Sequence, residues 1–160
     1  MATTTDLTDL YRRFTEELPA TSAIGEIMPY DWTSLPQPLE GIWMIYSMML
    51  DDFARELSNA INGFTLNVRR LRAWETLLAK LNDEEQSQAL HEFVEPAATL
   101  CLLTPYMIRS RFIFATAHLC HQVNRVRETE WPETSLPVDD EIYLDSASVQ
   151  GKLWRRYSRL

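Results

Sequence analysis

Two side chains, Arg111 and His118, lie within an apolar stretch of the sequence, and their types and spacing could perform chemistry. They are seven positions apart. That is nearly two turns of an α-helix, so both should project from one strip, about 10 Å apart along the axis. Histidine transfers protons near neutral pH, and the planar fork of arginine matches phosphate oxygens. Four more polar residues extend this strip or lie at its margins: Gln122, Arg125, His121 and Asn124.

The segment Arg111-Phe-Ile-Phe-Ala-Thr-Ala-His118 resembles the R-x(4–6)-H motif of HEPN domains, which are all-helical bundles of about this length. The resemblance implies a metal-independent endoribonuclease of a defence, toxin–antitoxin or stress system. It also implies a homodimer in which the motifs of two protomers face one cleft. Family members often carry a polar residue directly after the arginine, where this sequence has Phe112.

The resemblance also implies roles for single residues of the motif. His118 would be the catalytic histidine, acting in proton transfer around the ribose 2′-OH and the scissile phosphate. Arg111 would bind that phosphate and stabilise its developing charge. The other residues of the strip would then contact the RNA substrate: Gln122, Arg125, His121 and Asn124.

The same two residues also have a purely structural interpretation. Buried charge is costly unless it is paired, so Arg111 could face a carboxylate of the preceding helix, such as Glu92 or Glu95. His118 would then be a core histidine that donates to a backbone carbonyl. In this interpretation the chain is a non-catalytic adaptor or immunity-type module whose acidic surface holds a protein partner.

The sequence contains further acidic groups and possible metal ligands. Asp51, Asp52 and Glu56 could also supply a partner to the arginines, although the solvated face of a helix is the commoner role for such a group. His118 and His121 could bind a metal only with a cysteine, and no carboxylate follows at helical spacing. We therefore expect neither a metal nor a cofactor, and the sequence has no glycine-rich phosphate loop.

The composition limits the partners and the compartment. A net charge of −8 argues against a surface that binds nucleic acid or membrane throughout, because polyanions are repelled, but it leaves room for a local basic cleft. No window reaches the roughly 18 apolar residues of a membrane span, and the polar N-terminus does not resemble a signal peptide. We expect a cytoplasmic protein with free thiols at Cys101 and Cys120, with RNA, a second copy or another protein as partner.

The periodicity of apolar residues predicts an all-α fold. We expect residues 1–160 to form a single domain, a bundle of five or six mostly antiparallel helices. The resemblance implies that this bundle is HEPN-like. The expected helices, listed with their signals, are 6–18 capped by Asp6, 39–62 ended by Gly63, 66–81, a fourth from 83 interrupted at Pro96, 104–128 started by Thr104 and Pro105, and 146–160. A Pro-rich connection at 19–38 and an acidic loop at 131–145 complete the chain. The connection is apolar enough to lie against the bundle.

Overall fold

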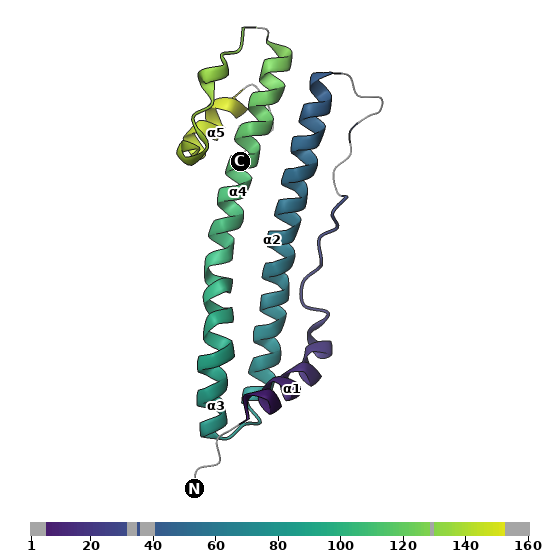
Figure 1. Ribbon diagram of the computed structural model, residues 1–160, viewed down its shortest axis with the longest axis vertical. Helices are drawn as coiled ribbons and strands as arrows, with labels where there is room; N and C mark the ends of the chain where they lie inside the picture. The colour runs from purple at the N-terminus through teal and green to yellow at the C-terminus, as the bar shows by residue number, and fades with distance from the viewer. Residues whose placement is uncertain (1–5, 32–34, 36–40, 129, 153–160) are drawn as a thin grey trace. The chain divides into compact units, whose positions relative to one another are not determined.

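A computed structural model describes residues 6–31, 35, 41–128 and 130–152. The helices are α1 (Leu7–Glu17), α2 (Ile42–Leu78), α3 (Asp83–Ala89), α4 (Glu95–Arg127) and α5 (Leu144–Gly151), as Figure 1 shows. Short 3-10 turns occupy Leu18–Thr21, Glu133–Ser135 and Asp139–Glu141, and a π-helical turn occupies Leu90–Val94. No β-strand occurs within the described residues, and the predicted all-α class is confirmed.

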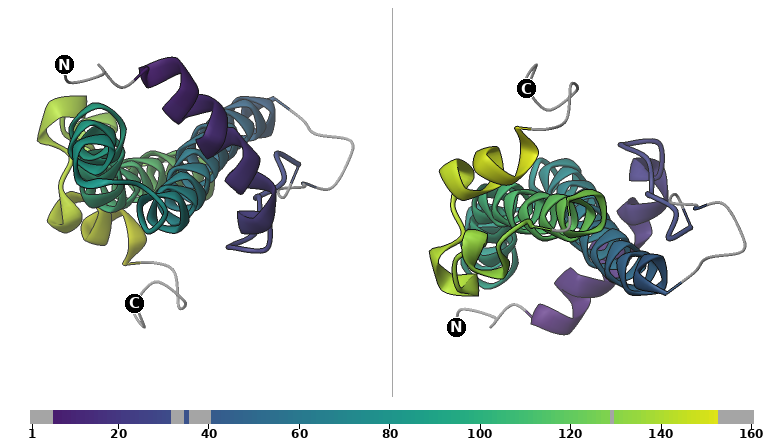
Figure 2. Two further views of the ribbon diagram at one scale, coloured as in Figure 1. Left: turned by 90° about the horizontal axis from the view of Figure 1, so that it is seen from below. Right: turned by 90° about the horizontal axis from the view of Figure 1, so that it is seen from above.

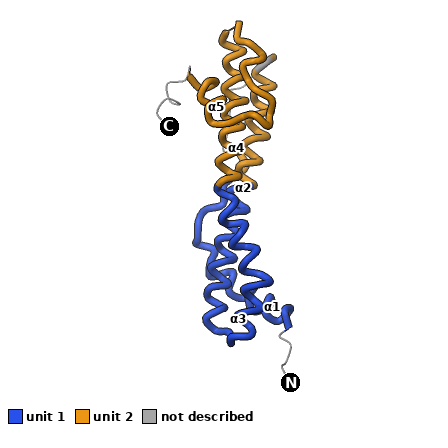
Figure 3. Tube along the Cα trace, turned by 90° about the vertical axis from the view of Figure 1, so that its left-hand side faces the viewer, with its two compact units in different colours: residues 1–28, 60–105 blue, residues 29–59, 106–160 orange. Residues whose placement is uncertain are grey.

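The chain divides into two compact units, coloured separately in Figure 3. Unit 1 comprises Met1–Met28 and Ala60–Pro105, and unit 2 comprises Pro29–Asn59 and Tyr106–Leu160. Each unit contains one part of α2 packed antiparallel to one part of the α3 to α4 segment. The predicted single domain stays a prediction, because a compact unit defined by contacts need not fold by itself.

The prediction of two helices at 39–62 and 66–81 is wrong, because α2 is one continuous helix. Gly63, expected as a cap, lies inside it, and its φ is not positive. A glycine inside a helix costs only about 1 kcal/mol relative to alanine. Burial of apolar side chains on either side of Gly63 outweighs that cost.

The predicted helix start at Thr104 and Pro105 is also wrong, because α4 runs through both residues. The Thr104 hydroxyl does not cap a helix but donates to the carbonyl of Leu100 at 2.6 Å. The interruption predicted at Pro96 is a π-helical turn, Leu90–Val94, which lies just before this proline. The N–H of Glu95 donates to the carbonyl of Leu90, five residues back, and Pro96 follows at the second position of α4, where proline is tolerated.

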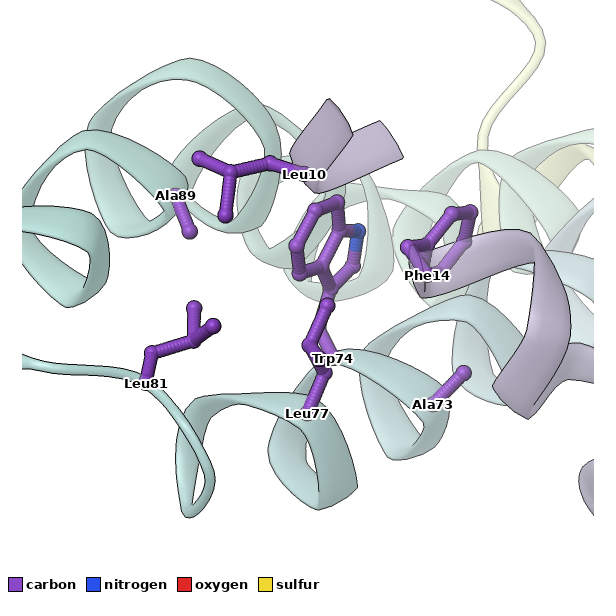
Figure 4. Packing of buried hydrophobic residues seen from close by; sticks show 7 residues of the cluster. All are labelled: Leu10, Phe14, Ala73, Trp74, Leu77, Leu81 and Ala89. Atoms are coloured by element: carbon purple, nitrogen blue, oxygen red, sulfur yellow. The ribbon is translucent and has the colours of Figure 1, made fainter. Parts of the chain in front are cut away.

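The core of unit 1 forms around Trp74, near the end of α2 (Figure 4). Its indole stacks on Phe14 of α1, with ring centroids 4.5 Å apart, and on Phe93, at 4.9 Å. Asp6 caps α1 as predicted by accepting from the N–H of Thr8 at 2.9 Å. The other buried residues of this cluster are Leu10, Ala73, Leu77, Leu81 and Ala89.

The connection after α1 lies against α2 in unit 1, which confirms that part of the prediction. The Arg69 guanidinium donates to the carbonyls of Ile24 and Gly25, each at 2.8 Å. The Asn62 side chain accepts from the N–H of Met28 at 2.7 Å and donates back to its carbonyl at 2.9 Å. Residues 32–34 and 36–38 of the predicted connection, and residues 39–40 at the start of the predicted second helix, lie outside the described residues.

The last helix begins earlier than predicted. Leu144 starts α5, and the described part of the chain ends at Lys152 just after it. The remainder of the predicted helix, including the basic residues Arg155, Arg156 and Arg159, lies outside the described residues. The acidic loop before α5 is confirmed as irregular, with two 3-10 turns.

Candidate functional site

The strip of polar residues lies on α4 in unit 2. There α4 packs against the part of α2 that belongs to this unit, while α5 and the 3-10 turns lie beside α4 on another side (Figures 1 and 2). The ring of Phe53 on α2 meets the ring of Phe114 on α4 edge to face, with centroids 5.8 Å apart. This contact fixes the register of the two helices beside Arg111 and His118.

Arg111 forms an ion pair with Glu56 of α2. The two side chains are 39% and 47% exposed, so water partly screens the pair. They lie at a pocket of about 440 Å³, which is also lined by Met107, Ser110 and Phe114. The guanidinium thus occupies the wall of an open pocket but is already neutralised by a carboxylate.

The predicted partners of Arg111, Glu92 and Glu95, are wrong. They were assigned to a preceding helix, but Glu95 begins the same helix α4, more than about four turns before Arg111. Its carboxylate instead contacts the ring of His91 at 3.3 Å. The residue that meets the guanidinium is Glu56, one member of the acidic group on the second helix that the sequence offers as an alternative partner.

His118 lies mostly inside unit 2, with its side chain 21% exposed. Its ring packs on Phe114, with centroids 4.3 Å apart. The Nε2 atom lies 3.2 Å from a carboxylate oxygen of the exposed Asp139, yet the two groups are not aligned as a hydrogen bond. The contact is therefore a charge attraction that exists when the imidazole is protonated, and Nε2 does not donate to a backbone carbonyl as the structural interpretation expected.

The other residues of the strip separate into two groups. Arg125 remains partly exposed and pairs with Glu133 at 2.5 Å. Three residues are buried instead: His121, Gln122 and Asn124. Their predicted role in binding RNA stays a prediction, and in this structure the first and last of them hold α5.

A buried polar network joins α4 to α5 through Gln150. The backbone carbonyl of Gln150 accepts a hydrogen bond from the side-chain amide of Asn124 at 2.8 Å. The side-chain amide of Gln150 donates to the backbone carbonyl of Ser135 at 2.7 Å. The Nδ1 atom of His121 lies 3.2 Å from the Gln150 side-chain oxygen and 3.2 Å from the Ser135 hydroxyl. Sequence reasoning missed Gln150, since an isolated glutamine in a short helix gives no signal of burial.

Two contacts at the Nδ1 atom of His121 require opposite roles of it. The indole N–H of Trp131, 3.3 Å away, can only donate to Nδ1, whereas the Gln150 side-chain oxygen at 3.2 Å can only accept from it, so the tautomer and charge of the imidazole decide which hydrogen bond forms. Burial lowers the pKa of His121. The contact with Gln150 opposes this shift, while Arg125 and His118 lower the pKa further and Glu133 raises it. A protonated His121 would therefore lose the hydrogen bond from Trp131.

Other chemistry finds little support in the described residues. Cys101 and Cys120 are free and partly buried, as predicted for their thiols, and burial raises the pKa of both. No three histidine, cysteine or carboxylate side chains gather there in a way that could hold a metal ion. Among the helices of those residues, none is long and apolar enough to cross a membrane.

The resemblance to HEPN domains rests on the motif from Arg111 to His118 and on the helical fold. The motif side chains lie on one helix, as the spacing predicted, and each faces a carboxylate of unit 2. Comparison of the chain with protein-family models, curated proteins and solved structures found no match.

Proposed function

We propose that this chain is a non-catalytic helical protein-interaction module of the adaptor or immunity type, in which Arg111 and His118 stabilise the fold. One observation carries the proposal. Each of the two side chains faces a carboxylate of its own unit, Glu56 for Arg111 and Asp139 for His118. The charge conflict in the sequence thus has an internal solution that needs neither substrate nor cofactor.

Electrostatics supports this assignment. An RNA phosphate that approached Arg111 would have to displace Glu56, and until it did so the two anions would repel each other. A second carboxylate, Asp139, lies next to His118 and opposes a phosphate at that end. The chain carries a net charge of −8, which adds to the repulsion of a polyanion.

Exposed apolar side chains support a protein partner. On α2 in unit 2, Met44, Ile45 and Met48 are all exposed, and their spacing places them next to one another on the helix surface. Methionine is flexible and adapts to different apolar partners, which is why it is frequent at binding surfaces. An acidic surface with such a patch is typical of a module that holds another protein.

A double-mutant cycle tests the structural role of Arg111. We expect Arg111→Ala and Glu56→Ala each to lower the free energy of unfolding, with a coupling of about 0.5–1 kcal/mol that decreases in high salt. His118→Ala should destabilise by about 1–3 kcal/mol, because it removes a ring packed on Phe114. Denaturant unfolding followed by circular dichroism measures all of these changes.

The matched control for this cycle is Arg109→Ala, on the same helix but without an ion-pair partner among the described residues. It should show no coupling to Glu56→Ala. Residues that serve catalysis at the expense of stability behave differently, because their removal is commonly neutral or stabilising. If Arg111→Ala and His118→Ala both left stability unchanged or raised it, the structural role would be wrong.

A second candidate function is the metal-independent endoribonuclease implied by the HEPN resemblance, acting as a homodimer. The observation that favours it is the pocket of about 440 Å³ at Arg111, which would give a phosphate access to the partly exposed guanidinium. This candidate predicts that RNA displaces Glu56 and is cleaved without metal, with His118 moving the proton. Cleavage that is lost in a folded His118→Ala variant would support it.

A further inference from the structure

A second groove in unit 2 lies between α4 and the start of α5. Its volume is about 300 Å³, and most of its lining is apolar. Both tyrosines that line it are exposed, Tyr106 at 74% and Tyr143 at 67%. The residues used in this argument are Tyr106, Arg109, Ile113, Ile142, Tyr143 and Leu144.

The cation of this groove, Arg109, lacks a partner. Among the described arginines it is the one for which no ion pair, hydrogen bond or ring contact is found within the described residues. Arg111 and Arg125, on the same helix, both reach carboxylates. An exposed guanidinium beside apolar side chains and tyrosines resembles the polar rim of a protein interface, where arginine and tyrosine are enriched.

Unpaired acids lie directly next to the same groove. The 3-10 turn Asp139–Glu141 leads into Ile142, which lines the groove. Asp139 faces His118, whereas Asp140 and Glu141 are exposed and form no ion pair with any described residue. The surface therefore carries both signs of charge and exposed aromatic rings.

From this combination we infer that the groove between α4 and α5 is the contact surface for a second copy of the chain. In a two-fold contact the same surface meets itself, so it must be complementary to itself. Here the Arg109 of each copy can face Asp140 and Glu141 of the other, which gives two symmetric sets of ion pairs. Exposed aromatic and aliphatic side chains, Tyr106, Tyr143 and Leu144, would be covered between them.

A second copy fits this surface better than a strongly charged partner does. An acidic peptide would pair with Arg109 but would be repelled by Asp140 and Glu141. A basic peptide would pair with the two acids but would be repelled by Arg109. The inference goes beyond the proposed function and does not depend on it, because neither Arg111 nor Glu56 lines the groove. Activity on RNA could be absent or present without changing the expected interface.

Charge reversal of the full chain tests the inference, with assembly measured by sedimentation equilibrium across the micromolar range. We expect the wild type to form dimers, and Arg109→Glu to raise the dissociation constant about tenfold or more, because each copy then presents like charges to the other. Adding Asp140→Arg and Glu141→Arg to Arg109→Glu should restore dimerisation, since the attraction returns with its signs exchanged. Circular dichroism verifies that each variant is folded.

The control is Arg55→Glu, an exposed position on α2 whose only ion-pair contact among described residues is a distant one with Asp52 at 3.9 Å. It should leave dimerisation unchanged. A wild type that is monomeric at every concentration would overturn the inference. So would a dimer that is insensitive to Arg109→Glu, or one that the charge-swapped triple variant does not restore.

Discussion

Trp74→Ala is expected to lower the free energy of unfolding by about 3–5 kcal/mol, the range for truncating a large buried aromatic residue. The indole is almost completely buried and stacks on Phe14 and on Phe93, at 4.5 and 4.9 Å between ring centroids. Its removal takes away both stacking contacts and leaves a cavity between α1, α2 and the π-helical turn. Urea unfolding followed by far-ultraviolet circular dichroism measures the loss.

Phe112→Ala is the matched control for this prediction. It also removes a large aromatic side chain from a helix, but from an exposed position, so a change below about 1 kcal/mol is expected. Equal losses in the two variants would show that burial at Trp74 does not organise unit 1. The contrast thus tests the assignment of the core and not the general effect of losing an aromatic ring.

The second large effect concerns pH and His121. Its pKa is lowered in the folded state, so between the folded pKa and the unfolded value of about 6.5 the unfolded chain binds more protons. Stability from this group is complete above about pH 6.5 and is lost as the pH falls through that window. The steepest contribution of one group is about 1.4 kcal/mol per pH unit.

The pH dependence is best measured as a difference between variants. We expect His121→Gln, which does not titrate, to lose this component of the unfolding free energy between about pH 7 and 5. His91→Gln, which removes a solvent-exposed histidine, is the control. A wild-type slope that persists unchanged in His121→Gln would show that His121 is not the neutral centre of the buried network.

Local signals predicted local structure well. Asp6 was expected to cap the first helix, and its side chain does accept the N–H of Thr8. Gly63 and Pro105 were misleading because packing along the long helices α2 and α4 outweighs the local cost of each, about 1 kcal/mol for glycine and about 3 kcal/mol for proline. Helix propensity reflects the preferences of a few neighbouring residues. The length of these helices depends instead on contacts between residues that are far apart in the sequence.

The candidate site was predicted in part. The conflict between burial and charge indicated a carboxylate partner for Arg111, which Glu56 supplies, whereas His118 lies beside Asp139 without a hydrogen bond. The identity of the partners could not follow from periodicity, because Glu56 and Asp139 come from separate segments that only the packing of unit 2 brings to α4. The residues predicted as the helices 39–62 and 66–81 form one helix, and α4 begins at Glu95. These differences changed which carboxylates could reach Arg111.

RNA cleavage by the purified chain in the presence of a metal chelator tests most directly whether Arg111 and His118 serve the fold and not catalysis. A mixed-sequence, end-labelled RNA is incubated with increasing wild-type protein and, in parallel, with folded His118→Ala. The ion pair of Arg111 with Glu56 and the position of Asp139 beside His118 predict intact RNA in both series. Cleavage by the wild type that disappears in the folded His118→Ala variant would contradict the account and assign the endoribonuclease function instead.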